Sequence, residues 1–422
     1  MAQYYHAHKV LLENCRGHSL CMRRCPTQAI RIRWGKAAIS DDLCVDCGTC
    51  ISTCPSGAII PVTDPLGEIS GFKYKVVVPS PVLYSQFEPT IHPYLIHQAF
   101  KSLGFDEVVD VGFFYSVLTK ALCQFISKSQ RRRPMISSLC PSILRLIQVK
   151  YPDLVEHVVP LDVPREIVAR EIRRTFPEKL GLKSEDIGII YIAPCPAKIV
   201  SIKQPAEKTR SWFDGAVSVR DVYAVLHPRI SGLKKQFTPD QVPKDFVFSV
   251  SWTTMGGVVR EAETENWLSV SGLDHVMKIF DDIENSRLRN VDFVEALACM
   301  LGCVSGSFNI ENPYIARSNS LKQRSKYEHF SIPDDSDIEK KLNEGYFYIE
   351  NPVLPRPTKY FDTDLETSIK RMRERERIYQ NLRQIDCGCC GAPTCMAFAE
   401  DCVRGEAKLT DCIFLTQTWG KE

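Results

Sequence analysis

The hydrophobic pattern of the chain changes near Phe72. Before it, residues 1–68 form short segments interrupted by Cys-Pro pairs and glycines, without the long periodic stretches of a conventional core. After it, apolar runs of strand length alternate with amphipathic stretches of helix length. This alternation predicts a parallel α/β architecture whose sheets are covered by helices.

The elements of the expected α/β region, residues 69–350, can be placed by number. The expected strands are Lys75 to Val78, Glu107 to Val111, Met135 to Leu139, Ile187 to Ala193 and Phe246 to Val250. The expected helices are Ile91 to Leu103, Val163 to Phe176 and Val219 to Leu226. Between them, Arg131 to Arg133 indicate a solvated turn, with a docking patch for an acidic partner as the alternative.

The pattern after residue 350 predicts a linker, a helix and a small last domain. Asn351 to Tyr360 carries three prolines, as linkers and surface straps do. Apolar residues then recur at helical spacing from Leu365 to Ile385, and the charged run RERER between them fits a solvated face. We expect the linker and exposed helix over residues 351–385 and a small helical domain over 386–422.

Composition excludes several classes of protein. The chain has 422 residues, 44% of them hydrophobic, and 53 Lys+Arg against 51 Asp+Glu, a net charge of +2. This balance argues against a nucleic-acid or membrane-surface protein held by bulk charge. The first residues lack a basic segment followed by an apolar one, and no apolar run approaches the roughly 20 residues of a membrane span. We therefore expect a cytoplasmic protein of two to four domains.

The 18 cysteines are the unusual feature of the composition. Seven lie between Cys15 and Cys54, six between Cys387 and Cys412, and five across the long middle. A chain with enough apolar residues for ordinary cores does not need disulfides to fold, and cytosolic thiols stay reduced. Clustered cysteines in this setting indicate metal binding.

The N-terminal cysteines have ferredoxin spacing. A C-x2-C-x2-C-x3-C-P run ends at Cys54 and Pro55, and in bacterial ferredoxins the fourth cysteine of such a run ligates the other cluster of the pair. The upstream copy has His18 where the second cysteine is expected. His18 is either incidental, leaving a three-cysteine or lost cluster, or it ligates iron through a ring nitrogen, which we favour because the frame is otherwise intact.

This spacing predicts a ferredoxin-like α+β domain with two 4Fe-4S clusters over residues 1–68. Cluster one has the expected ligands Cys15, His18, Cys21 and Cys54, and cluster two has Cys25, Cys44, Cys47 and Cys50. With so little conventional core, metal must supply stability to this region.

The C-terminal cysteines form a C-x2-C-x4-C-x16-C frame. Its members are Cys387, Cys390, Cys395 and Cys412, and Cys389 and Cys402 are extra thiols. Spacing alone does not separate a four-thiolate zinc site from an iron-sulfur cluster. The frame resembles the small 4Fe-4S domain of several redox proteins, so we expect one C-terminal 4Fe-4S cluster.

Four cysteines of the middle region each follow an apolar segment in a turn-like context. They are Cys140, Cys195, Cys299 and Cys303. Loops at the ends of parallel strands can converge on one buried cofactor. The alternative is that these are unrelated core thiols, because free cysteine often acts as a small hydrophobe.

The three segments SSLCP, APCPAK and CMLGC, in this order, resemble the signature loops of the catalytic domain of iron-only (FeFe) hydrogenases. Supporting features are VVVPSPVLY near Val76, the turn at Gly256 to Val258, and Glu295 ahead of ALACMLGC. With the two flanking cysteine regions, the resemblance covers nearly the whole chain.

The resemblance implies an H-cluster in which Cys140, Cys195, Cys299 and Cys303 hold a 4Fe-4S cubane. Cys303 would bridge to a two-iron centre carrying CO, cyanide and a dithiolate amine. Lys198 matches the family lysine that hydrogen-bonds a cyanide, a charge-assisted contact. The implied reaction interconverts H2 with protons and electrons, and the implied partners include the hydrogenase maturases.

Several positions depart from the catalytic members of the family. Leu139 replaces the cysteine that passes protons to the bridgehead amine, and Ser201 replaces a glutamate of the second loop. Residues 119–129, where family members carry relay carboxylates, contain no acid, and Ala193 replaces a methionine. Turnover needs an unbroken donor-acceptor path, so fast hydrogen chemistry is not expected. The combination resembles the sensory branch of the family.

Two main functions therefore stand against each other. The first is a sensory, low-activity hydrogenase that relays electrons through its 4Fe-4S clusters to a redox partner or a signalling kinase or phosphatase. The second is a hydrogenase-like protein without the two-iron centre, acting in electron transfer or iron-sulfur assembly. A third hypothesis is that the protein only transfers electrons. The sequence leaves the oligomeric state open, a homo-oligomer included.

Overall fold

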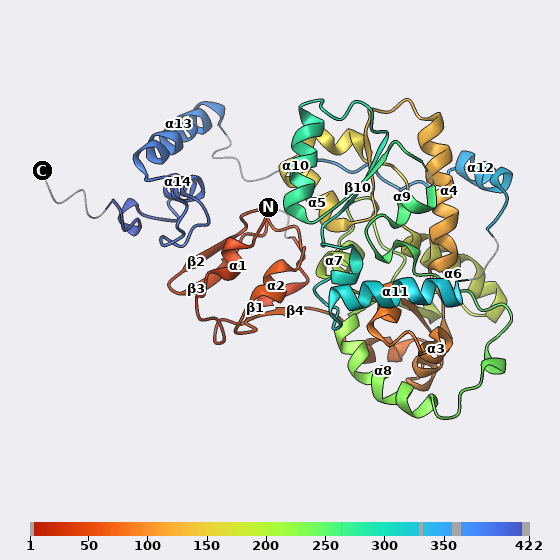
Figure 1. Ribbon diagram of the computed structural model, residues 1–422. Coiled ribbons are helices and arrows are strands. Elements are labelled where there is room, and N and C mark those ends of the chain that lie inside the picture. The colour runs from red at the N-terminus through yellow and green to blue at the C-terminus, as the bar shows by residue number, and fades with distance from the viewer. Residues whose placement is uncertain (1–3, 263, 329–331, 357–363, 416–422) are drawn as a thin grey trace, which may run out of the picture.

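The computed structural model describes residues 4–262, 264–328, 332–356 and 364–415 (Figure 1). The predicted fold class is confirmed: a ferredoxin-like domain precedes a parallel α/β domain, and a small helical region follows it. None of the helices in these described ranges combines the length and apolar character that a membrane span needs. Part of the expected linker, residues 357–360, lies outside the described residues.

The N-terminal domain is a small arrangement of strand pairs and short helices. Strands β1 (His8–Val10) and β4 (Ile59–Pro61) pair antiparallel, as do β2 (Ile30–Arg33) and β3 (Lys36–Ile39). The helices α1 (Leu20–Arg23) and α2 (Thr49–Thr53) each begin after a residue in the left-handed conformation, Ser19 and Gly48. Each of these turns lies inside one of the two cysteine runs.

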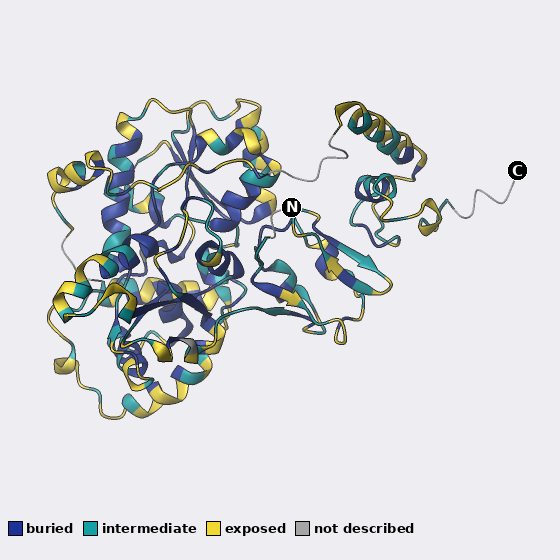
Figure 2. Ribbon diagram, turned by 180° about the vertical axis from the view of Figure 1, so that it is seen from behind, coloured by how far each residue is buried: buried dark blue, intermediate teal, exposed yellow. Residues whose placement is uncertain are grey.

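The first sheet of the α/β domain has four parallel strands in the order β6-β5-β8-β9. Their bounds are Glu107–Val108, Tyr74–Pro79, Ile187–Ala193 and Gly215–Ser218. Every residue of β8 is buried because helices cover both sheet faces: α6 (Pro164–Leu180) packs on Ile189, while α3 (Pro93–Ser102) and α8 (Val219–Leu233) pack on the face of Ile190. Figure 2 shows this strand region as dark blue.

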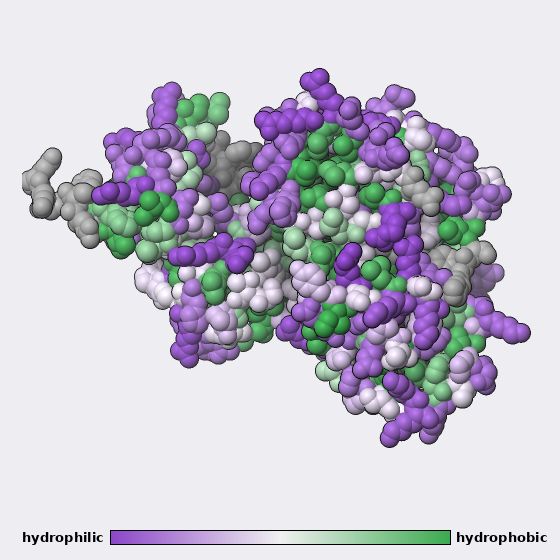
Figure 3. All heavy atoms as spheres, viewed as in Figure 1, coloured by the Kyte–Doolittle hydropathy of each residue, from purple (hydrophilic) through white to green (hydrophobic). Residues whose placement is uncertain are grey.

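The second sheet has three parallel strands in the order β10-β11-β7. Their bounds are Trp267–Ser271, Phe293–Leu297 and Met135–Ile136. Helices α5 (Pro141–Lys150) and α10 (Leu273–Glu284) pack on the face that carries Val294. Helices α4 (Gly112–Lys128) and α9 (Gly257–Ala262) pack on the face that carries Phe293. On the face that Figure 3 shows, hydrophilic residues lie around the periphery of this domain, with apolar residues among them.

The remaining helices connect these layers or follow them. They are α7 (Pro196–Lys203), α11 (Pro313–Tyr327), α12 (Asp335–Asn343), α13 (Leu365–Asn381) and α14 (Cys395–Val403). Short 3-10 helices lie at Leu66–Gly71, Pro81–Gln86, Pro152–His157, Ser184–Asp186, Pro239–Gln241, Ser251–Thr253, Cys303–Ser305 and Leu409–Asp411. Helices α13 and α14 share a small apolar core of their own, which includes Ile378 and Phe398.

Most expected elements of the middle region are present, with one clear error. Phe246 to Val250 forms no strand. Phe248 and Val250 are buried against α3 and α8, so the segment is apolar because it packs there and not because it joins a sheet. The strands β9, β10 and β11 were not predicted, and the strands at Glu107 and Met135 end sooner than expected.

Candidate metal centres

The structure gathers the expected cluster-two ligands around one cavity of the N-terminal domain. Cys25, Cys44, Cys47 and Cys50 line it together. Asp46 and Gly48 have φ values of 51° and 78°, and these left-handed residues bend the C-x2-C-x2-C loop around the cavity. The backbone N–H of Ala29 donates to the Cys25 sulfur at 3.3 Å. Hydrogen bonds of this kind stabilise thiolate ligands of iron-sulfur clusters.

The expected cluster-one ligands line a second cavity of the same domain. Cys15, His18, Cys21 and Cys54 contribute to it. The backbone N–H of Ala37 donates to the Cys15 sulfur at 3.4 Å and that of Ala58 to the Cys54 sulfur at 3.3 Å. His18 therefore lies at the position of a fourth donor beside three thiols. Whether its ring nitrogen ligates iron stays a prediction.

Sequence reasoning missed a buried group beside cluster two. The Asp46 carboxylate lies 2.9 Å from His6 Nδ1 and 3.2 Å from His8 Nδ1, and His8 Nε2 lies 3.9 Å from the Cys44 sulfur. Burial favours a raised pKa for Asp46, but the hydrogen bonds from the two histidines outweigh it and hold the pKa well below its usual range. Asp46 holds His8 beside Cys44, one of the expected ligands. The spacing of these residues in the sequence did not indicate this contact.

The four middle cysteines converge on one cavity between the two parallel sheets. Cys140, Cys195, Cys299 and Cys303 line it with Lys198. Cys140 follows β7 and precedes α5, Cys195 follows β8 and precedes α7, and Cys299 follows β11. Three of the thiols thus follow the carboxyl ends of parallel strands, where loops of α/β folds meet, and Cys303 lies further along the loop of Cys299. The reading of four unrelated core thiols does not fit this geometry.

A close approach fixes the last loop of this site. Gly302 has a φ of 95°, and a Cβ there would come within 2.6 Å of the Met255 backbone nitrogen. The Met255 N–H donates to the Leu301 carbonyl at 2.9 Å. The loop that carries Cys299 and Cys303 is therefore pressed against the segment before α9, which requires glycine at this position.

Deep burial disfavours the free thiolate forms of the middle cysteines. Burial raises the pKa of Cys195 to about 12 and that of Cys299 well above its usual range. Buried thiols of this kind keep their protons unless a metal replaces them. Lys198 Nζ lies 3.3 Å from the Cys303 sulfur. Burial favours a lowered pKa for Lys198, but its electrostatic interaction with Cys303 outweighs burial and raises the pKa well above its usual range.

A 4Fe-4S cubane fits this donor set of four convergent thiols. Cys47, an expected cluster-two ligand, also lines the middle cavity. The ferredoxin-like domain thus reaches the site with one of its own cysteines. The assignments of individual ligands and of the CO, cyanide and dithiolate groups stay predictions.

The positions that depart from catalytic hydrogenases lie around this cavity. Leu139 directly precedes Cys140 and packs into the apolar core beside α4. The Ser201 hydroxyl accepts from Arg165 at 2.9 Å and donates to the Lys198 carbonyl at 2.9 Å. Ser201 thus ties α6 to α7 behind Lys198, while Leu139 presents no group that transfers a proton.

Helix α4 has no acid between residues 119 and 129, but an acid from another helix, which the sequence did not indicate, contacts it. Thr119 on α4 donates to the carboxylate of Glu261 on α9 at 2.8 Å, and Trp252 Nε1 lies 3.2 Å from the same oxygen. Residues 119–129 hold no acid of their own. Glu261 comes close only because α9 packs on α4, and nothing in the local sequence of α4 signals it.

The C-terminal cysteines line a fourth cavity. Cys387, Cys390, Cys395 and Cys412 contribute to it, and Cys389 touches it as well. Cys402 packs into the α13/α14 core, and Cys123 into the core beside α4. The expected four-thiol set is therefore together in space, and its metal stays a prediction.

Comparison with known proteins places the chain in a family. It matches the family model of the iron only hydrogenase large subunit, C-terminal domain, over residues 73–264 and 235–307, more than half of its 422 residues. The chain belongs to this family. A 4Fe-4S dicluster domain matches residues 10–58, and an Fe-S cluster domain matches 382–414. It is a hydrogenase-like iron-sulfur protein with 4Fe-4S domains.

The hydrogenase-like fold also appears among solved structures. Two variants of the FeFe-hydrogenase of Chlamydomonas reinhardtii align with TM-scores of 0.50 and 0.51 at 15% identity. Each alignment covers 70% of this chain and 97% of the other. At this identity the likeness shows the fold alone.

The curated relatives are distant and carry two kinds of name. Iron hydrogenase 1 of Clostridium pasteurianum is 21% identical over 263 residues, 50% of this chain and 44% of the relative. A cytosolic Fe-S cluster assembly factor of Neosartorya fischeri is 24% identical over 231 residues, 46% of this chain and 38% of the relative. The chain thus spans less than half the length of either protein.

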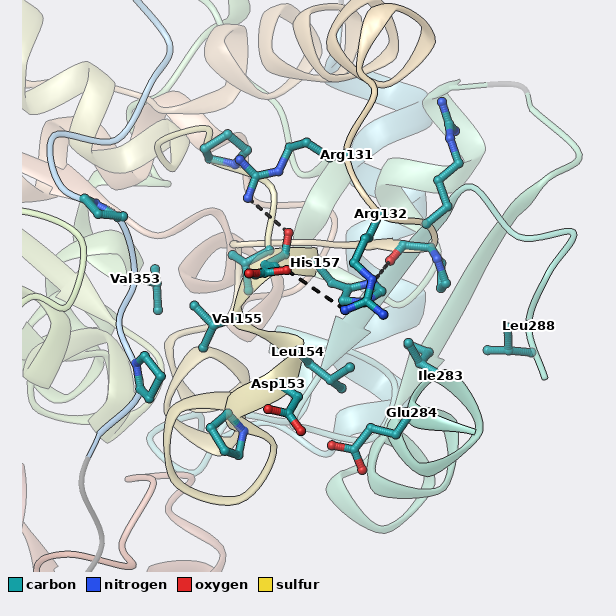
Figure 4. Close-up of a pocket in the computed structure, with 18 of the residues that line it drawn as sticks. Arg131, Arg132, Asp153, Leu154, Val155, His157, Ile283, Glu284, Leu288 and Val353 are labelled. Atoms are coloured by element: carbon teal, nitrogen blue, oxygen red, sulfur yellow. Dashed lines mark hydrogen bonds and ion pairs between the residues drawn. The ribbon is translucent and has the colours of Figure 1, made fainter. Parts of the chain in front are cut away.

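The predicted surface turn at Arg131 to Arg133 borders a groove of about 1230 Å³ (Figure 4). Arg131 donates to the Glu156 carbonyl at 3.0 Å, and Arg133 pairs with Asp292 at 2.5 Å. Asp153 and Glu284 line the same groove, so its charge is mixed. Docking of an acidic partner here stays a prediction.

Proposed function

We propose that this protein is a sensory, low-activity FeFe hydrogenase of the cytoplasm. It binds H2 at a two-iron centre attached to Cys303 and slowly splits it into protons and electrons. The electrons pass to the 4Fe-4S clusters of the same chain, and the changed redox state is read by a redox partner or a signalling kinase or phosphatase.

The contact between Lys198 and Cys303 is the observation that carries the proposal. Lys198 is a buried ammonium 3.3 Å from the sulfur that would bridge the two centres, and a buried cation is stabilised by each anion that it meets. Bound cyanide is such an anion, and a charge-assisted hydrogen bond to it repays the burial. Without the two-iron centre, Lys198 would still have the Cys303 sulfur as a partner but no cyanide to bind.

The replaced relay positions support low activity. Leu139 stands where a proton must leave, and an alkyl side chain neither donates nor accepts one. A positioned acid-base group is worth about 100- to 10,000-fold in rate. Its loss leaves binding of H2 at the metal intact while it slows turnover, as suits a sensor.

The second candidate is a hydrogenase-like protein without the two-iron centre that acts in iron-sulfur assembly. Relatives named as cytosolic Fe-S cluster assembly factors favour it, including one of Saccharomyces cerevisiae that is 27% identical over 109 residues. In this reading, Leu139 replaces cysteine because no hydrogen chemistry takes place.

Infrared spectroscopy of the full chain, produced with the hydrogenase maturases, separates the two candidates. The sensory hydrogenase shows stretching bands of metal-bound CO and cyanide, and the same protein produced without maturases lacks them. Absence of these bands from matured protein that holds its full iron and sulfide would overturn the first proposal and favour the second.

A further inference from the structure

The C-terminal 4Fe-4S domain is not a free appendage in this structure. Residues of the loop that carries its cysteines contact the β2 edge of the ferredoxin-like domain. The Ile32 N–H donates to the Gly391 carbonyl at 2.8 Å, and Arg33 donates to the Cys390 carbonyl at 3.1 Å. Arg23 donates to the Cys387 carbonyl at 2.9 Å.

One buried carboxylate holds the two domains together. Asp401 on α14 is 2% exposed, and its Oδ2 accepts hydrogen bonds from Arg31 Nε at 2.6 Å and from Arg33 Nη2 at 2.5 Å. Two guanidinium groups from β2 thus neutralise one carboxylate of the C-terminal domain. A buried charge pair of this kind leaves an uncompensated charge when one side is removed, so the contact depends on both.

The backbones approach too closely for an ordinary side chain. Gly391 has a φ of 77°, and a Cβ there would lie 1.9 Å from the Ile32 carbonyl oxygen. A Cβ on Gly388 would lie 3.0 Å from the Met22 methyl group, and Met22 is fully buried. The fit of the two domains is therefore built into glycine positions of the cysteine loop.

These contact residues also border the expected clusters. Ile32 lines the cavity of Cys15, His18, Cys21 and Cys54, and Gly391 follows Cys390 directly. Met22 follows Cys21, and Gly388 follows Cys387. A single hydrogen bond, between Ile32 and Gly391, thus connects the wall of the cluster-one cavity to the C-terminal cysteine loop.

We infer that the C-terminal cluster exchanges electrons directly with cluster one across this interface, and that Asp401 is the residue that positions it. In each transfer, reduced cluster one loses one electron and is oxidised, and the C-terminal cluster gains that electron and is reduced. No bond forms or breaks and no proton moves. The inference extends the proposed function by naming the end of its electron chain, but it does not require the two-iron centre.

The test is electron paramagnetic resonance of the full chain, with its 4Fe-4S clusters loaded and reduced by dithionite. Two reduced clusters held at a fixed short distance broaden each other's spectra through magnetic coupling. We expect coupling between cluster one and the C-terminal cluster in the unmodified protein. In Asp401→Ala this coupling should be lost at unchanged iron content, so that the C-terminal cluster gives the spectrum of a separate cluster while any coupling between clusters one and two stays.

Glu400→Gln is the matched control, because Glu400 neighbours Asp401 but pairs with Arg404 inside the C-terminal domain at 2.7 Å. It should keep the coupling. If Asp401→Ala loses iron, a variant with Arg31→Gln and Arg33→Gln leaves the C-terminal domain unaltered and should abolish the coupling. Coupling that persists in an iron-replete interface variant, or that is absent from the unmodified protein, overturns the inference.

Because infrared bands report only the two-iron centre, their absence would leave this experiment unaffected. Conversely, separate spectra in the unmodified protein would not touch the proposed hydrogen chemistry. The two proposals therefore fail independently.

Discussion

The ferredoxin-like domain and the middle domain hold their cysteines in opposite ways. In the first, the thiols belong to the core: Cys15 and Cys21 are buried members of an apolar cluster that has few other large residues from this domain. In the second, two covered parallel sheets make the core, and the four expected ligand cysteines stand in loops after strand ends. The ferredoxin-like domain therefore depends on its metal ligands for its core, whereas the middle domain has a core that does not depend on its site.

The largest expected effect follows from this contrast. Cys50→Ser should remove cluster two and abolish hydrogen-exchange protection across residues 4–62, because metal supplies the missing stability there. Cys299→Ser, its matched partner, should remove the middle cluster and leave the protection of β8 intact. Hydrogen-exchange mass spectrometry measures protection in both variants. The comparison would be contradicted if Cys299→Ser removed protection from β8 as fully as Cys50→Ser removes it from residues 4–62.

A buried carboxyl of the middle domain gives the next effect. Burial raises the pKa of Asp110 to about 7, although Tyr84 donates to it at 2.8 Å and the Gly112 N–H at 2.6 Å. Its folded pKa exceeds its unfolded pKa, so the proton favours the folded state. Stability is greatest below about pH 4 for this group and falls as pH rises to about 7, by up to about 4 kcal/mol.

Asp110→Asn should flatten that pH dependence. Unfolding of the cluster-free chain in urea at pH 5 and pH 7 checks it through the tryptophans of the middle domain. An unchanged slope in the variant would mean that other groups carry the pH dependence.

The third effect concerns Lys198. Lys198→Met should leave iron of the middle cubane in place but weaken retention of the two-iron centre by about 10- to 100-fold, the usual effect of losing a hydrogen bond to a metal ligand. Infrared band intensity per cubane measures it. Lys203→Met on the same helix is the control, because Lys203 pairs with Asp64 at 2.7 Å, away from the site. Equal intensities in both variants would contradict the role of Lys198.

The smallest effect is expected at Leu139. Leu139→Cys restores a thiol beside Cys140, but the neighbouring relay positions still hold Ser201 and a helix without acids of its own. We expect less than about a tenfold rise in H2 oxidation, below the roughly 100-fold of a complete acid-base group. Leu139→Ala controls for the smaller volume. A rise of several hundredfold would show that Glu261 or another group already completes the path.

The same contrast explains what the sequence could predict. The ferredoxin ligands lie within one stretch at fixed spacing, and the structure brings them together as that spacing indicates. The middle cysteines needed a family resemblance, because their meeting depends on strand order across 164 residues, from Cys140 to Cys303. His8 beside Cys44 and Glu261 beside Thr119 were missed because tertiary packing alone creates those contacts.

Strand prediction failed for a related reason. Phe246 to Val250 has a strand-like apolar pattern, yet burial against helices satisfies it equally well. The short run Gly215–Ser218 looks like a turn and becomes β9 only because β8 lies beside it. In both cases the neighbouring elements, and not local propensity, decide the structure.

Isotope exchange tests the central claim most directly. The matured full chain is placed under D2 in ordinary water, and HD is measured by mass spectrometry. We expect slow HD formation that depends on maturation, because H2 is bound and split while proton exit past Leu139 is hindered. Absence of HD above the level of protein produced without maturases would contradict it.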